Sequence, residues 1–188
     1  MIGQAFMSLA TAFGLSTSAG LNAYIPLLVV ALLARFTSLV TLNEPWDALS
    51  SWWVVGTLIV LLAIEILVDK VPAVDTVNDA IQTFVRPAAG AILFASTTNT
   101  IGLSPVLAAV CGVILAGGVH VVKAGGRPVL TATTAGMVNP IVSTLEDIVS
   151  FVVSVLAIVI PLLMATLIMF VAALLTWWYV RRRQRQRV

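Results

Sequence analysis

The chain has 188 residues, of which 60% are hydrophobic and only 10% are charged, and its formal net charge is +2. A soluble domain carries about a quarter charged residues, so this composition and a mean hydropathy of +1.09 exclude an ordinary soluble domain. The single cysteine, Cys111, excludes an internal disulfide, and the long apolar runs predict one integral membrane domain.

The first apolar segment, residues 2–34, is too long for one straight crossing. As a continuous helix it would measure about 50 Å, whereas the hydrocarbon core of a bilayer is ~30 Å thick. The segment also contains "GLSTSAGLNAYIP" at 14–26, where glycines, hydroxyls and a proline weaken a helix. We therefore predict a first span that is broken near Gly20. Ahead of the break, a minor polar stripe follows helical spacing: Gln4, Ser8 and Thr11.

The middle of the chain predicts three further spans and one short interfacial helix. Residues 52–68 form a clear second span that begins with two tryptophans, as membrane interfaces favour. Residues 74–85 place apolar and polar side chains on opposite faces, which predicts an amphipathic helix at the interface. A short third span starts at Arg86-Pro87, and a fourth covers 104–122.

The last third of the chain predicts two more spans and a basic tail. Residues 127–147 are unusually polar for a membrane segment and are interrupted by glycine and proline, so we expect a broken fifth span there. Residues 148–179 form the sixth, with Pro161 as a kink and an aromatic belt at its end. We interpret the tail "RRRQRQRV", 181–188, as a cytoplasmic anchor rather than a nucleic-acid-binding segment, so residues 1–180 form a single transmembrane domain.

The basic residues predict an orientation. In a six-span arrangement with broken first and fifth spans, only Arg35 of the ten basic residues falls outside. The other nine, which are Lys70, Arg86, Lys123, Arg127 and the five tail arginines, fall on the side of the termini. The positive-inside rule then places both termini in the cytoplasm.

The two predicted breaks share a pattern. "TSAGLNAYIP" (17–26) and "TTAGMVNPIV" (133–142) both read hydroxyl, hydroxyl, Ala, Gly, followed by Asn and Pro. Paired interrupted segments are typical of transporter binding sites, where positive helix ends favour an anionic or dipolar guest. Close packing of small residues is the alternative. The predicted substrate site near the midplane comprises Ser18, Gly20, Asn22, Thr134, Gly136 and Asn139.

Charged residues gather near the predicted cytoplasmic interface. Glu65 lies about one helical turn deeper than Asp69, where an unpaired charge is costly, so it should be paired, protonated or facing water. An ion-pair network that locks helix ends is one interpretation, and a gate or proton relay is the other. The constellation comprises Glu65, Asp69, Lys70, Asp75, Asp79, Arg86, His120, Lys123 and Arg127.

No catalytic or metal-binding pattern accompanies these polar residues. The sequence lacks a catalytic-triad, zinc-protease, paired-cysteine or phosphate-loop motif, so we expect neither an enzyme nor a cofactor or metal. A polar stripe does run along the predicted fifth span and should face other helices or a water path. It comprises Asn139, Ser143, Glu146 or Asp147, and Ser150.

Two long stretches carry a resemblance to a known family. They are "EILVDKVPAVDTVNDAIQTFVRPAAG" (65–90) and "GGVHVVKAGGRPVLTATTAGMVNPIVSTLED" (117–147), with "TSAGLNAYIPLL" in addition. The chain resembles the bacterial integral membrane proteins grouped as the domain-of-unknown-function family numbered four thousand one hundred and twenty-six. The resemblance implies a bacterial cytoplasmic-membrane location and carries over no functional residue. A shorter likeness links Arg-Pro and the following hydroxyls to lipid-carrier translocases with re-entrant loops.

These observations predict an all-α polytopic membrane protein of about six spans. Its first and fifth spans are broken and meet around a polar centre, which favours a small permease or channel-like protein for a polar or anionic solute. A lipid or lipid-carrier translocase and a non-transporting scaffold or assembly factor are the alternatives. The lipid bilayer is the expected partner, a homodimer is plausible, and nucleic acid is not expected.

Overall fold

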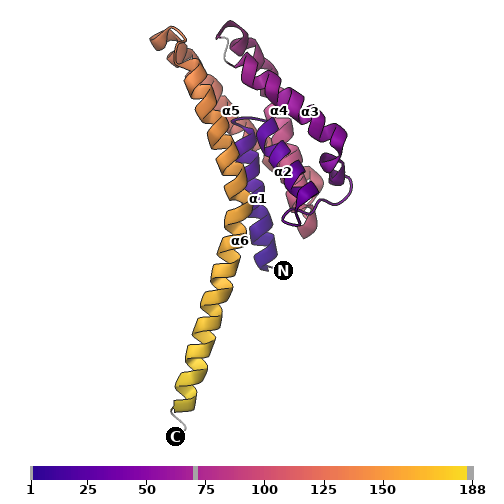
Figure 1. The fold of residues 1–188 in the computed structure, drawn as a ribbon, viewed down its shortest axis with the longest axis vertical. Coiled ribbons are helices and arrows are strands. Elements are labelled where there is room, and N and C mark those ends of the chain that lie inside the picture. Colours follow the sequence, from indigo (N-terminus) through magenta and orange to yellow (C-terminus); the bar gives the residue numbers. More distant parts are fainter. Residues whose placement is uncertain (1, 70–71, 186–188) are drawn as a thin grey trace.

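The chain folds as a bundle of helices that run alternately up and down (Figure 1). The computed structural model describes residues 2–69 and 72–185, and within these ranges there is no strand. Both termini lie toward the lower end of the bundle in Figure 1, here called the terminal end. The elements are α1 (Ile2–Ala19), α2 (Tyr24–Phe36), η1 (Trp46–Ser50), α3 (Trp52–Val68), α4 (Pro72–Thr98), η2 (Asn99–Ile101), α5 (Pro105–Thr134) and α6 (Asn139–Arg185). The all-α prediction is confirmed.

Two of the described helical stretches are long and apolar enough to cross a membrane. They are Pro105–Thr134, with a mean hydropathy of 2.2, and Asn139–Pro161, with 2.0. Helices α2 and α3 are apolar but shorter. With 13 residues, α2 is about 20 Å long.

The bundle buries polar side chains and exposes apolar ones. On α5, Val113, Ile114, Val121 and Val122 are exposed, whereas His120, Lys123 and Arg127 of the same helix are buried. A protein in water arranges these classes the other way round. The interior of this bundle therefore holds polar side chains beside a hydrophobic core, and much of its outer surface is apolar.

The predicted break in the first apolar segment exists, but it reverses the chain instead of kinking one span. Helix α1 ends at Ala19 and α2 begins at Tyr24, so the two form a hairpin (Figure 1). The Asn22 side chain explains the restart, because its Oδ1 accepts the backbone N–H groups of Tyr24 and Ile25 at 3.0 and 3.1 Å. Pro26 lies in the first turn of α2, where its missing N–H has no intrahelical partner to lose.

The second predicted break is also a reversal. Ala135 and Gly136 adopt left-handed backbone angles, with φ of 51° and 78°, and the Gly136 N–H donates to Thr131 O at 3.2 Å. This geometry ends α5 as a left-handed helix cap does. Helix α6 then starts at Asn139, with a proline in its first turn. The repeated pattern in the sequence therefore encodes two helix–turn–helix reversals.

Predicted boundaries at two places are wrong because helices continue through them. The amphipathic stretch 74–85 and the third span form one helix, α4, with Pro87 inside it. The fourth span continues through Pro128 to Thr134, so 127–147 is not a span of its own. Arg86 and Arg127, which precede these prolines, are anchored in buried ion pairs, and this explains why the helices persist.

The first reversal changes which basic residues share an end of the bundle. Arg35 lies at the terminal end, where its Nη1 donates to Ser50 O at 2.8 Å and its guanidinium covers the Trp52 ring. Lys123 and Arg127 lie toward the opposite end, near the turn between α5 and α6. The predicted grouping of Arg86, Lys123 and Arg127 with the tail, opposite Arg35, is therefore wrong. Lys70 lies outside the described residues.

Small residues let α4 and α5 approach closely. A Cβ added to Gly90 would lie 2.5 Å from the Cβ of Ala116 and 2.6 Å from Gly112 O, and one added to Gly112 would clash with the Gly90 backbone. Gly20 also packs on α5, since a Cβ added to it would lie 2.5 Å from Ala116 O. Gly112 and Ala116 form a small-xxx-small pair of the kind that brings membrane helices together.

We expect Gly112→Ala to weaken the α4–α5 contact by about 1–3 kcal/mol, because the added methyl group overlaps the backbone of α4. Gly118→Ala on the same helix is the matched control, since nothing lies within 4 Å of its added Cβ. Thermal unfolding in detergent should show a lower midpoint for Gly112→Ala only. Equal midpoints for the two variants would show that the helices do not pack this closely.

Candidate functional site

A cluster of charged side chains lies in the part of the bundle opposite the terminal end. It joins α3, α4, α5 and α6, and most of its members are buried. Seven of the predicted network residues belong to it, together with two acids at the start of α6. This charge cluster comprises Glu65, Asp69, Asp79, Arg86, His120, Lys123, Arg127, Glu146 and Asp147.

Arg86 is the most deeply buried member, with no exposed side-chain surface. Its Nη2 donates to Glu65 Oε1 at 3.0 Å, and its Nη1 lies 3.0 Å from His120 Nδ1. Because a guanidinium can only donate, His120 Nδ1 must accept, and the imidazole proton is on Nε2. That nitrogen lies 3.0 Å from Thr83 Oγ1, whose own proton goes to Asp79 O. His120 is thus a neutral bridge within a fixed network.

Arg127 connects three helices through ion pairs. Its Nη2 lies 3.1 Å from Glu146 Oε2 and 3.5 Å from Asp69 Oδ2, and its Nη1 lies 3.8 Å from Asp79 Oδ2. Asp69 has further support, because it accepts hydrogen bonds from Asn78 Nδ2 at 2.8 Å and Ser143 Oγ at 3.1 Å. The end of α3 is thereby tied to α4, α5 and α6.

Lys123 and Asp147 hold the turn between α1 and α2. Lys123 Nζ donates to the carbonyl of Leu21 at 2.9 Å and pairs with Glu146 Oε2, also at 2.9 Å. Asn22 Nδ2 donates to Asp147 Oδ1 at 2.9 Å. The positive charge therefore meets the end of α1, and the carboxylate lies beside the start of α2, as helix dipoles favour.

The two turns do not come together as the predicted shared site requires. Asn22 contacts Asp147, which lies eight residues into α6, so the first turn is recessed by about 12 Å along α6 from the second. Thr134 Oγ1 donates to Leu130 O and Asn139 Nδ2 to Thr131 Oγ1, both within the second turn. Of the predicted set, Ser18 and Asn22 contact α6 and Gly20 packs on α5, while Thr134, Gly136 and Asn139 belong to the other turn.

A line of hydroxyl groups runs between α1 and α6. Ser18 Oγ donates to Ser150 O at 2.7 Å and lies 2.8 Å from both Ser150 Oγ and Ser154 Oγ. Further along, Thr11 Oγ1 donates to Ala157 O at 2.9 Å. Pro161, four residues later, has no N–H to satisfy that carbonyl, so Thr11 takes the place of the missing helix bond. We call this contact, from Thr11 to Asn22 and from Asp147 to Ala157, the polar seam.

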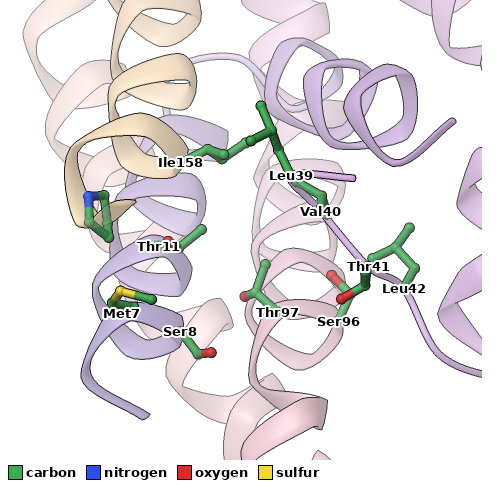
Figure 2. Close-up of a pocket in the computed structure, with 11 residues that line it drawn as sticks. Met7, Ser8, Thr11, Leu39, Val40, Thr41, Leu42, Ser96, Thr97 and Ile158 are labelled. Carbon is green, nitrogen blue, oxygen red and sulfur yellow. The ribbon is translucent and has the colours of Figure 1, made fainter. Parts of the chain in front are cut away.

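The seam ends at a pocket near the terminal end. This pocket, of about 170 Å³, lies between α1, α4, α6 and residues 39–42, and Figure 2 shows the Ser8 and Thr97 hydroxyls facing each other across it. A hollow of about 660 Å³ adjoins it and shares Met7, Ser8 and Thr41. Among the described residues, no charged side chain lines the smaller pocket. Its lining is Met7, Ser8, Thr11, Leu39, Val40, Thr41, Leu42, Ser96, Thr97, Ile158 and Pro161.

Some polar atoms near the charge cluster have no hydrogen-bond partner among the described residues. They are Glu65 Oε2, Asp79 Oδ1, Gln82 Oε1 and Arg86 Nε, all of them buried. Three of the four residues lie on α4, on the face that meets α3 and α5. Buried polar atoms of this kind mark a place where water or a bound group is accommodated.

Several site residues escaped the sequence analysis. Glu146 and Asp147 were expected only as part of a stripe, and Ser154 extends that stripe by one turn beyond Ser150. Ser96 and Thr97 lie in the hydroxyl-rich run "ASTTNT", a signal that could have indicated the pocket. The side chain of Asp75 lies outside the described part of the chain.

Comparison with protein families gives one match. The model of the family described as Domain of unknown function (DUF4126) matches residues 9–182. This range includes every member of the charge cluster and the polar seam. A search of curated proteins found no match, and a search of solved structures found none.

Replacing Glu65 tests the buried ion pair. We expect Glu65→Ala to lower the free energy of unfolding by about 3–5 kcal/mol, because it leaves the Arg86 guanidinium buried without its carboxylate. Glu65→Gln keeps a hydrogen-bond acceptor and should be milder. Unfolding titrations in detergent measure both variants. If Glu65→Ala were as stable as wild type, Glu65 would be solvated and the pair would contribute little.

The contact between Thr11 and Ala157 can be tested with a double-mutant cycle. We expect Thr11→Val to destabilise the protein by about 1–3 kcal/mol, because the carbonyl of Ala157 loses its donor. In a Pro161→Ala background, the new backbone N–H satisfies that carbonyl, so the same change should be nearly neutral. The exposed Thr57→Val is the control. Equal effects of Thr11→Val in both backgrounds would contradict this account of the bond.

Proposed function

This chain belongs to the family described as Domain of unknown function (DUF4126), and we propose that it is a small permease or channel-like protein of the membrane. The observation that carries the proposal is the polar seam between α1 and α6. It links the hydroxyl-lined pocket at the terminal end with the charge cluster at the other end. A bundle with apolar outer faces and a polar line through its interior has the layout of a solute path.

The seam is closed in this conformation by a close contact between two helices. A Cβ added to Gly14 would lie 2.5 Å from the Cβ of Ala157, so α1 and α6 touch between Thr11 and Ser18. Passage of a solute requires these helices to separate at that point. The contact involves small side chains, and the Thr11 hydroxyl, which replaces the helix bond that Pro161 removes, must release Ala157 O when the helices separate.

Six membrane crossings and cytoplasmic termini are part of the proposal. The helices alternate in direction and both termini lie at one end (Figure 1). Arg35 and Arg181 belong to that end, whereas Arg86, Lys123 and Arg127 are buried and paired with acids. The positive-inside rule therefore still favours cytoplasmic termini, in a bacterial inner membrane.

Two other expectations remain predictions. A homodimer is one, and its mass in detergent can be measured directly. A lipid translocase is the other, and leaflet exchange of a fluorescent phospholipid in vesicles that do not leak solute would favour it over a permease. A scaffold would show neither activity.

The proposal is tested by the access of water to the seam. In a Cys111→Ala background, Ser18→Cys and Ser154→Cys should react with a small membrane-impermeant thiol reagent, because opening of the seam admits water and the thiolate is the reactive form. Ile64→Cys, on the exposed apolar face of α3, should react far more slowly. The measurement is the rate of modification in vesicles, followed by mass spectrometry.

If both seam cysteines stay as protected as Ile64→Cys over long incubations, the interior is permanently dry. That result would refute the permease proposal and favour the scaffold. The thermal midpoints of the cysteine variants are measured as well, and midpoints well above the labelling temperature show that modification reports opening and not unfolding.

A further inference from the structure

We propose that the solute path selects small monovalent cations such as K⁺ over anions, with the pocket between α1 and α4 as the first binding site. This inference rests on the proposed function and names its substrate class. It reverses the expectation of an anionic guest that the helix breaks suggested. Its basis is the direction in which the hydroxyl groups donate their protons.

Three of the five hydroxyls in the lining of the pocket present acceptors. Thr11 donates its proton to Ala157 O, Ser96 to Leu93 O, and Thr97 to Leu93 O at 2.7 Å. A hydroxyl has one proton and two lone pairs, so these three groups turn oxygen lone pairs toward a guest. Oxygen ligands without thiol or imidazole suit hard cations. Within the part of the chain that the structure describes, the pocket lining also has no basic residue that would repel a cation.

The seam contains three further hydroxyls, on Ser18, Ser150 and Ser154. Ser154 Oγ can donate to Ser150 O at 2.7 Å, Ser150 Oγ can donate to Ser18 O at 3.2 Å, and Ser18 Oγ lies 2.8 Å from both of these hydroxyl oxygens. While the contact is closed these groups bind one another and two backbone carbonyls, so their lone pairs become available to a guest only when α1 and α6 separate. A cation that moves along this contact would exchange one hydroxyl oxygen for the next, as selective pores exchange hydration for protein oxygens.

The anion-binding features of the first turn are already occupied. The free N–H groups at the start of α2 donate to Asn22 Oδ1, and the Asp147 carboxylate lies next to them. Lys123 pairs with Glu146 and donates a hydrogen bond to the Leu21 carbonyl. An anion arriving at this turn would meet a carboxylate and no open donor, so the helix dipole does not favour it.

The far end of the path carries more acids than bases. Among the described residues of the charge cluster, five are carboxylates and three are Lys or Arg. Glu65 Oε2, Asp79 Oδ1 and Gln82 Oε1 add buried acceptors that lack a donor. Excess negative charge at the mouth of a narrow path concentrates cations there and excludes anions.

The experiment uses the full chain in phosphatidylcholine vesicles with a KCl gradient and a voltage-sensitive dye. Loss of K⁺ from the KCl-rich side makes that side negative, whereas loss of chloride makes it positive. We expect a negative potential that persists when gluconate replaces chloride. A positive potential would overturn the cation assignment and leave the permease proposal in place.

Variants connect the signal to the pocket. Thr97→Val removes one hydroxyl acceptor from the pocket. The hydrogen bond that is lost with it, from Thr97 Oγ1 to Leu93 O, lies within α4 and does not join two helices. We expect this variant to slow K⁺ entry about tenfold. Ser8→Ala, from the facing helix, should act in the same direction (Figure 2). Thr57→Val, on the exposed face of α3, is the isosteric control and should be unchanged. Equal rates for Thr97→Val and Thr57→Val in well-folded protein would show that the pocket is not the cation site.

A neutral solute distinguishes failure of the cation inference from failure of the permease proposal. Glycerol entry, followed by light scattering, is measured in the same vesicles. If glycerol equilibrates faster than in empty vesicles while KCl produces no potential, the cation inference is wrong and the permease proposal survives. If neither glycerol nor any ion enters faster than in empty vesicles, both are wrong.

Discussion

Lys123 and Arg127 bind Glu146, and this joint between α5 and α6 sets the position of the other helices. Arg127 reaches on to Asp69 at the end of α3, and Lys123 reaches the carbonyl of Leu21 in the first turn. Charged groups and backbone carbonyls buried in a membrane bundle have no water to bind, so each must be paired with another group of the protein. The ion pairs therefore fix the depth of the first hairpin and the direction of α3 at once.

Small residues make this arrangement possible. Gly90 and Gly112 bring α4 against α5, and Gly14 brings α1 against Ala157 of α6. At these distances short hydroxyl side chains can reach the backbone of the neighbouring helix, as Ser16 does when it donates to Gly90 O at 3.0 Å. The two glycines predicted to line a site have other places, since Gly20 packs on α5 and Gly136 lies in the second turn. Close packing and a polar interior are thus two aspects of one design, not alternatives.

Much of the fold could be predicted from the sequence, but the meaning of its breaks could not. Apolar runs and tryptophans correctly indicated α3, and the glycines, Asn22 and Pro26 correctly indicated where α1 ends. Whether the chain then continues or turns back depends on Lys123 and Asp147, more than 100 residues away, and no local pattern carries that information. The same limit explains Pro87 and Pro128, which end helices by local rules yet lie inside α4 and α5. The charge cluster could be predicted because an unpaired charge in an apolar segment is energetically costly. The pocket could not, because four separate stretches of the chain form it.

The distant partners of the first turn have a consequence for synthesis. Leu21 and Asn22 are made early, but Lys123 and Asp147 follow 102 and 125 residues later. At roughly 5–20 residues per second, the tip of the first hairpin waits about 5–25 seconds for the groups that satisfy it. During that time its exposed carbonyl and amide need water or a chaperone. The hairpin would therefore stay near the membrane surface or the insertion machinery and move to its recessed position only after α5 and α6 arrive, so the first segment to be made is the last to take its place.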